Sequence, residues 1–121
     1  MTEWANELNN FSGTENYYRI MTDAVITDGA KFIADKGGAY WLITAIASYL
    51  PKFTQKETFI VATLQVTRTA TSSHAILKLD DGNDNILAQQ FIEYTDFELG
   101  EFKLYACYNG DVWVIMLPKE Y

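Results

Sequence analysis

Apolar and polar residues alternate with a period of two along the second half of the chain, starting at Phe59. Such alternation is typical of strands that bury one face. In the first segment the residues expected on the buried face are Ile60, Ala62, Leu64 and Val66. The pattern recurs and predicts five strands, over residues 59–67, 75–80, 86–94, 102–108 and 112–117.

Short polar connections separate these segments. Residues 69–73 and 95–100 are expected to be loops, and residues 81–85 a turn. Asn109-Gly110 predicts a tight hairpin, because both residues tolerate the positive φ that such a turn demands. Parallel neighbours would need long crossovers, so these connections predict an antiparallel meander.

The first half of the chain has helical signals. Ser12 and Glu15 have the spacing of a capping box, which predicts a short helix carrying Tyr17, Tyr18, Ile20 and Met21. Residues 24–27 could be a short strand or an extended link. Asp28 is expected to cap a helix over residues 29–36, which Gly37-Gly38 would end.

Residues 39–50 are apolar on nearly every side, which is typical of a central, covered helix. Pro51 is expected to end it. All helices would then precede the strands. The predicted class is α+β, with N-terminal helices packed on a C-terminal antiparallel sheet, a meander of about five strands.

Length and composition limit the alternatives. The chain has 121 residues, 49% hydrophobic and 21% charged, with seven glycines and two prolines. This excludes a disordered or collagen-like chain, and a single cysteine excludes a disulfide framework within it. We expect one domain over residues 1–121, with residues 1–10 loosely ordered at its edge.

The chain shows no membrane signal. Its first eight residues contain two acids and no base, unlike a signal peptide. The apolar run over residues 39–50 is well short of the roughly 20 residues that span a bilayer. The sequence therefore predicts a protein of the host-cell cytoplasm without membrane contact.

Charge is concentrated at one end of the sequence. Residues 79–121 hold nine acids against two lysines, which accounts for the whole net charge of −7. A nucleic-acid backbone is an unsuitable partner, because phosphates need clustered lysine and arginine. The distribution permits a protein partner with a basic surface, or merely keeps the protein soluble. The acidic strip proposed for partner binding consists of Asp80, Asp81, Asp84, Glu93, Asp96, Glu98 and Glu101.

No catalytic or cofactor motif stands out. His74 and Cys107 are the only residues of their kinds, and Cys107 falls in the middle of a predicted strand, where a small apolar residue fits. No paired ligand spacing predicts zinc, and residues 80–85 fail the EF-hand spacing for calcium. Phosphate-binding glycine motifs are absent from the sequence. We expect no enzyme, no cofactor and no metal.

An alternative site is aromatic. Tyr40, Trp41 and Trp113 could line a small-ligand pocket between the apolar helix and the sheet.

Three segments resemble a small uncharacterised bacterial family, a domain of unknown function also found in phages and mobile elements. They are the region 28–49 with Gly-Gly-Ala-Tyr-Trp-Leu-Ile at residues 37–43, Asp-Asp-Gly-Asn at residues 80–83, and Tyr-Thr-Asp-Phe-Glu-Leu at residues 94–99. The resemblance carries no catalytic residue. It implies a genetic context in which small accessory proteins often disarm host defences.

The leading hypothesis is a non-enzymatic binding protein, an inhibitor of a bacterial defence complex of the CRISPR type. Its acidic strip would dock on a basic nucleic-acid channel and compete with phosphates. A small-ligand binding or sequestering module is the alternative. A homodimer is compatible with either.

Overall fold

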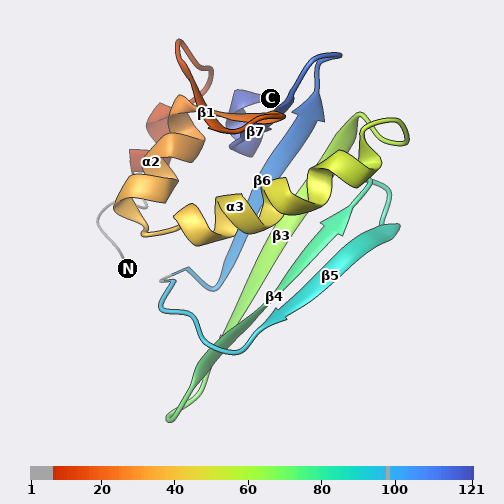
Figure 1. The fold of residues 1–121 in the computed structure, drawn as a ribbon. Helices are drawn as coiled ribbons and strands as arrows, with labels where there is room; N and C mark the ends of the chain where they lie inside the picture. Colours follow the sequence, from red (N-terminus) through yellow and green to blue (C-terminus); the bar gives the residue numbers. More distant parts are fainter. Residues whose placement is uncertain (1–6, 98) are drawn as a thin grey trace.

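The computed structural model describes residues 7–97 and 99–121, and shows one mixed sheet of seven strands with two α-helices (Figure 1). Of the segment expected to be loosely ordered, residues 1–6 lie outside the described residues, and Leu8–Asn10 form a short 3₁₀ turn, η1. The strand order is β1-β2-β7-β6-β3-β4-β5. The strands are β1 Tyr17–Met21, β2 Ala24–Thr27, β3 Phe59–Arg68, β4 Ser73–Asp80, β5 Ile86–Ile92, β6 Glu101–Tyr108 and β7 Trp113–Met116.

The five strands expected in the second half are all present. In β3, Ile60, Ala62 and Leu64 are buried as the alternation predicts, whereas Val66 is only half-buried. In β4 the buried side chains also alternate, and they are Ala75, Leu77 and Leu79. The period of two therefore assigned the buried face of both strands.

The predicted meander is wrong, because β6 pairs with β3 and not with β5. The connection over residues 93–100, called the crossover here, carries the chain from one edge of the sheet back past β4 and β3. Strands β3, β4, β5 and β6 thus have the order 4-1-2-3 of a Greek key. Alternation specifies which face of a strand is buried, and it leaves open which strand lies beside it.

The helix expected at residues 17–21 is also wrong, since these residues form β1. β1 pairs antiparallel with β2, and β2 pairs parallel with β7 at the far end of the chain. In this segment it is Thr14, between Ser12 and Glu15 of the expected capping box, that meets a helix start: its Oγ1 accepts a hydrogen bond from the Asp28 amide at 2.9 Å. The fold is therefore mostly sheet, with its two helices in the middle of the chain, and the predicted α+β arrangement of N-terminal helices on a meander is overturned.

The helices are α2, Asp28–Lys36, and α3, Tyr40–Tyr49. Thr27, rather than Asp28, caps α2, because its hydroxyl accepts from the Ala30 amide. Gly38, with φ +61°, makes the left-handed bend between the helices. α3 ends at Tyr49, just before Pro51, as the sequence predicts. The chain then continues into a 3₁₀ turn, η2 Leu50–Phe53, which has Pro51 in its first turn.

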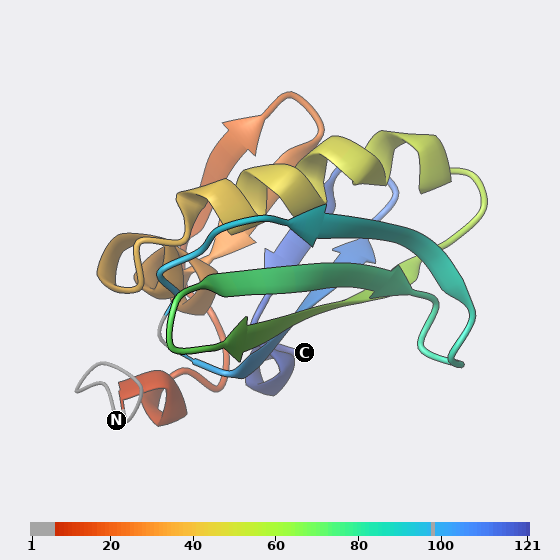
Figure 2. The same ribbon diagram turned by 90° about the horizontal axis from the view of Figure 1, so that it is seen from below.

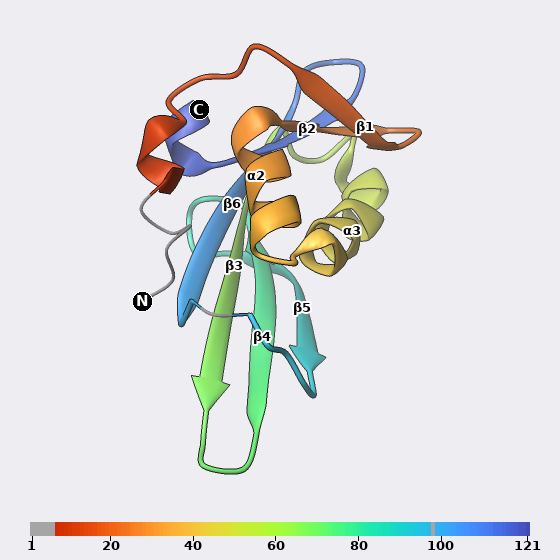
Figure 3. The ribbon, with the colours of Figure 1, turned by 90° about the vertical axis from the view of Figure 1, so that its left-hand side faces the viewer.

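The two helices lie together on the same face of the sheet (Figures 2 and 3). Their buried side chains, including Ile33, Ile43 and Ile46, form one core with the buried faces of the strands. The β3–β4 hairpin extends beyond them (Figures 1 and 3). In the part of the chain that the structure describes, no helix is long and apolar enough to cross a bilayer.

The hairpin between β6 and β7 turns one residue later than expected. Tyr108 pairs with Trp113, and the Asn109 amide donates to the Val112 carbonyl at 3.2 Å. This bond continues the register of Tyr108 with Trp113, so the chain turns at Gly110 and Asp111. Gly110 has φ +96°, whereas Asn109 has no positive φ and instead accepts two backbone amides through its Oδ1.

The last turn, η3 Pro118–Glu120, fastens the C-terminal strand to α2. Glu120 accepts hydrogen bonds from the Thr27 hydroxyl at 2.6 Å and from the amides of Gly29 and Leu117. A carboxylate at a helix N-terminus also interacts favourably with the helix dipole. Gly29 is buried here, and a Cβ on it would lie 2.5 Å from both Leu117 Cδ1 and Glu120 Oε1.

We predict that Gly29→Ala destabilises the protein by about 1–3 kcal/mol, because the added methyl overpacks this contact. Helix propensity alone would favour the alanine. Gly13→Ala is the matched control, since a Cβ there meets nothing within 4 Å, and it should change stability by less than about 0.5 kcal/mol. Urea denaturation of both variants measures this. If Gly29→Ala were as stable as Gly13→Ala, η3 would be able to move away from the added methyl without any loss of stability.

Candidate functional site

The first part of the acidic strip lies in the turn between β4 and β5. Asp80, Asp81 and Asp84, called the acidic turn here, are clustered in it. Asp80 Oδ1 accepts from the Gly82 amide at 2.7 Å, and Asp81 Oδ1 from the Asn83 amide at 2.8 Å. These are the local bonds that shape Asx turns. Two of the three carboxylates therefore shape the turn.

Asp81 has the most partners of the three. Its Oδ2 accepts from the Asn85 side-chain amide at 2.8 Å. This bond, together with the Asn83 amide, lowers the pKa of Asp81 from its ordinary value. Asp84 is exposed and has φ +66°, the left-handed conformation that aspartate tolerates better than most residues. Asp84 is thus the exposed one of the three, whereas Asp80 and Asp81 are half-buried.

The second part of the strip lies on the crossover and at the start of β6. Glu93, Asp96 and Glu101, called the acidic crossover here, are exposed, and Glu98 lies outside the described residues. Buried side chains anchor this segment: Thr95 is 4% exposed and Phe97 is 1% exposed. The Thr95 amide donates to the Ser73 carbonyl, and Arg68 Nη2 donates to the Phe97 carbonyl.

The acidic turn and the crossover segment that carries Glu93 and Asp96 lie at opposite ends of β5 (Figure 1). Glu101 is instead on β6, opposite Gln65 of β3, so β3 and β4 lie between it and β5. β5 has seven residues, so about 20 Å of strand separates them. Charges are screened beyond about 8–10 Å at physiological salt. The acidic strip is therefore two separate groups of carboxylates, a separation that the sequence order alone conceals.

Between the two acidic groups, β5 forms one edge of the sheet. Its sequence, Ile-Leu-Ala-Gln-Gln-Phe-Ile, contains no charged residue. Ile86 is 53% exposed and Phe91 59%, and Tyr94, just beyond the strand, is 73% exposed. An uncharged edge with exposed apolar side chains, flanked at each end by carboxylates, is the candidate binding surface.

The alternative aromatic site is not assembled. Trp113 is fully buried, and its Nε1 donates to Thr54 Oγ1 at 3.1 Å. Tyr40 is 44% exposed at the other end of α3, where its hydroxyl donates to Asp35, and Trp41 is half-buried. A cavity of about 270 Å³ lies elsewhere, lined by Leu8 and residues 101–103 and 117–119.

His74 and Cys107 do not form a pair. His74 lies opposite Thr67 on β3 and Cys107 opposite Phe59, so they are at opposite ends of that strand. The His74 ring packs 5.5 Å from the Phe91 ring, and burial raises the pKa of the Cys107 thiol. Among the described residues, no group of three or more histidine, cysteine or acidic side chains could hold a metal.

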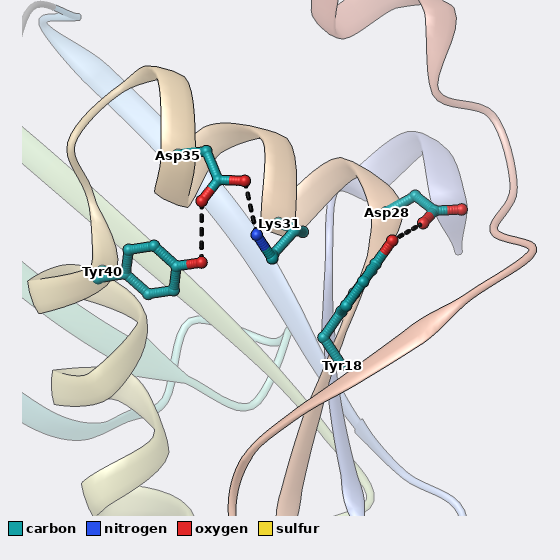
Figure 4. A network of polar contacts seen from close by, with 5 residues as sticks. All are labelled: Tyr18, Asp28, Lys31, Asp35 and Tyr40. Atoms are coloured by element: carbon teal, nitrogen blue, oxygen red, sulfur yellow. Dashed lines mark hydrogen bonds and ion pairs between the residues drawn. The ribbon is translucent and has the colours of Figure 1, made fainter.

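A polar network on α2 was not foreseen from the sequence (Figure 4). Lys31 Nζ contacts Asp35 at 2.6 Å and lies 5.6 and 5.8 Å from the ring centroids of Tyr18 and Tyr40. The ion pair has i,i+4 spacing, which a scan of the expected helix could have found. The hydrogen bond between them lowers the pKa of Asp35 and raises that of Lys31.

Asp28 ties the loop before β1 to the start of α2. Its Oδ2 accepts from the amides of Glu15 and Asn16 at 3.0 and 3.3 Å, and its Oδ1 accepts from the Tyr18 hydroxyl at 2.9 Å. The bond from the Glu15 amide is the main cause that lowers the pKa of Asp28, while the bond to Asp28 raises the pKa of Tyr18. These contacts give Asp28 a structural role.

Comparison with known proteins identifies a family and no individual relative. A family model described as a family of unknown function, DUF6876, matches residues 2–121. No curated protein and no solved structure matches the chain.

The lowered pKa of Asp28 predicts acid sensitivity. Its charged form stabilises the fold above the pKa it has in the unfolded chain, about 3.9, and this contribution is lost as the pH falls through its folded-state pKa. The melting temperature of Asp28→Asn should therefore lie below wild type at pH 7, and the difference should shrink below about pH 4.

Tyr18→Phe should show a smaller loss of the same sign, because it removes one donor to Asp28. Asp111→Asn changes an exposed carboxylate in the β6–β7 hairpin and serves as the control. A pH-independent difference between wild type and Asp28→Asn would contradict the assignment.

Proposed function

Since the chain belongs to the DUF6876 family, whose function is unknown, we propose from its geometry that it is a non-enzymatic binding protein for a partner with a basic surface. The observation that carries the proposal is the position of the carboxylates. The acidic turn at one end, and Glu93 and Asp96 of the acidic crossover at the other, flank one uncharged, exposed edge strand. A basic partner that spans β5 would meet negative charge at both ends and apolar side chains between them.

Charge complementarity of this kind mainly accelerates association and selects the partner. Apolar contacts with Ile86, Phe91 and Tyr94 would then slow dissociation. Clustered acids with few bases suit a protein partner better than a nucleic acid, whose phosphates they would repel. The acidic groups instead resemble phosphates in charge, which supports competition for a basic nucleic-acid channel.

A finer proposal concerns the target. The family resemblance to proteins of bacteria, phages and mobile elements supports a defence complex of the CRISPR type, met in the host cytoplasm. The mechanism is occlusion: carboxylates at the two ends of β5 occupy basic sites that would otherwise hold nucleic-acid phosphates.

The charge proposal is tested with two variants that change the net charge equally. Glu93→Gln, Asp96→Asn and Glu101→Gln together neutralise the acidic crossover and take the net charge from −7 to −4.

The matched control neutralises three exposed acids near η1 and β1, and consists of Glu7→Gln, Glu15→Gln and Asp23→Asn. The probe is a fluorescent oligolysine, whose binding rate is followed by stopped-flow anisotropy at several salt concentrations.

We expect the crossover variant to associate with oligolysine at least about threefold more slowly than the control variant at low salt. The difference should vanish in about 0.5 M salt, where screening removes the steering field. Equal rates for the two variants would mean that only net charge matters, and the proposed surface would be wrong.

The target proposal is tested in cells that carry a CRISPR-type system directed against a phage. Wild-type protein should raise the plating efficiency of that phage by at least about tenfold, and the crossover variant should raise it less than the control variant does. No rise across a panel of such systems would contradict this target.

A further inference from the structure

We propose that the partner binds by strand addition: an extended segment with basic residues at its ends pairs with the free edge of β5 and lengthens the seven-stranded sheet. This inference rests on the proposed function and names its mode of recognition. Strand addition uses the unpaired backbone groups of a sheet edge for affinity and alternate side chains for specificity. Four features of the described residues support it.

The first feature is the position of β5 in the sheet. β5 pairs with β4 on one side and is the last strand in the order. One row of its backbone amides and carbonyls therefore faces outward. Native proteins usually blunt such an edge with charged side chains, proline or bulges, because a bare edge recruits other strands.

The second feature is the contrast with the opposite edge. β1 is shorter, has Arg19 at its centre, and is interrupted by an irregular register between Arg19 and Met21. β5 has no charge and no proline, and its one irregularity lies at its start, where Ile86 pairs with Asp80. Residues 88–92 pair in unbroken register with β4, so only β1 is protected along its length.

The third feature is that β5 is held in place on the helix side. Ala88, Gln90 and Ile92 pair with the buried side chains of β4 and thus face the helices. The Tyr49 hydroxyl of α3 donates to Gln90 Oε1 at 2.9 Å. On the opposite face, Phe91 lies beside Ile76 and is 59% exposed. An added strand would find a fixed template and could cover Phe91.

The fourth feature is charge, which selects the occupant. A second copy paired antiparallel through β5 would place the acidic turn of each copy against the acidic crossover of the other. Like charges in this position oppose association. A segment with lysine or arginine at both ends would meet carboxylates at both ends instead. We therefore assign the edge to a basic partner rather than to a homodimer.

The test compares two synthetic peptides of equal charge. The first reads Lys-Lys-Val-Thr-Val-Thr-Val-Lys-Lys. In the second, proline replaces the central valine, which removes a backbone donor and disfavours strand pairing without changing the charge. Affinities are measured by fluorescence anisotropy, and the contact is located from backbone amide shifts of the isotopically labelled full chain.

We expect the first peptide to bind about tenfold more tightly than the second, with the largest amide shifts in β5. Phe91→Thr should weaken it about threefold, because threonine keeps the strand propensity but loses the aromatic contact. Tyr17→Thr on β1 is the matched control, since Tyr17 is also 59% exposed, and it should leave the affinity unchanged.

The remaining outcomes would overturn the inference in distinguishable ways. Equal binding of both peptides, still dependent on the acidic crossover, would exclude strand addition and leave the charge-based function standing. Binding of neither peptide nor oligolysine would reject both. Dimerisation through β5 that strengthens with salt, seen by sedimentation, would assign the edge to a second copy.

Discussion

The parallel pairing of β2 with β7 is the constraint on which the rest of the fold depends. It joins the second strand to the last, with Ala24 opposite Trp113 and Ile26 opposite Ile115. α2 begins directly after β2, so this pairing also fixes where the helices cover the sheet. Glu120 adds hydrogen bonds to the same junction. Contacts so distant in sequence carry a large loop-closure entropy, which slows the formation of such a sheet.

Much of the sheet could be predicted from the sequence, because burial on one face leaves a local record. The alternation in β3 and β4 specified which side chains enter the core, and the apolar run at residues 39–50 identified α3. Strand neighbours leave no such record. The capping-box spacing at Ser12 and Glu15 was a local signal, which sheet pairing at Tyr17–Met21 overrode. Tertiary contacts thus determined the secondary structure of segments whose local preferences were weak.

For the candidate site, too, the sequence predicted one part and only the structure showed the rest. The sequence identified the carboxylates, and the structure separated them by placing a whole strand between the acidic turn and the acidic crossover. It also showed that Asp80 and Asp81 shape their own turn, so residues with equal charge have unequal freedom to meet a partner. The significance of β5 depends on its being an edge, and edge position follows from the crossover. A strand of the same sequence inside the predicted meander would have been covered on both sides.

The burial of Trp113 has an optical consequence. Its indole is 0% exposed, packs 5.3 Å from the Tyr108 ring and donates to Thr54, the residue that follows η2. An indole in such surroundings emits at shorter wavelength than one in water, so its spectrum reports whether the chain after α3 is docked on β7. Trp41 is half-buried and accessible to a soluble quencher. The chain also contains Trp4. With Trp4 replaced by phenylalanine, the emission spectrum and its quenching together distinguish separation of α3 from β7 from a local change around the start of α3.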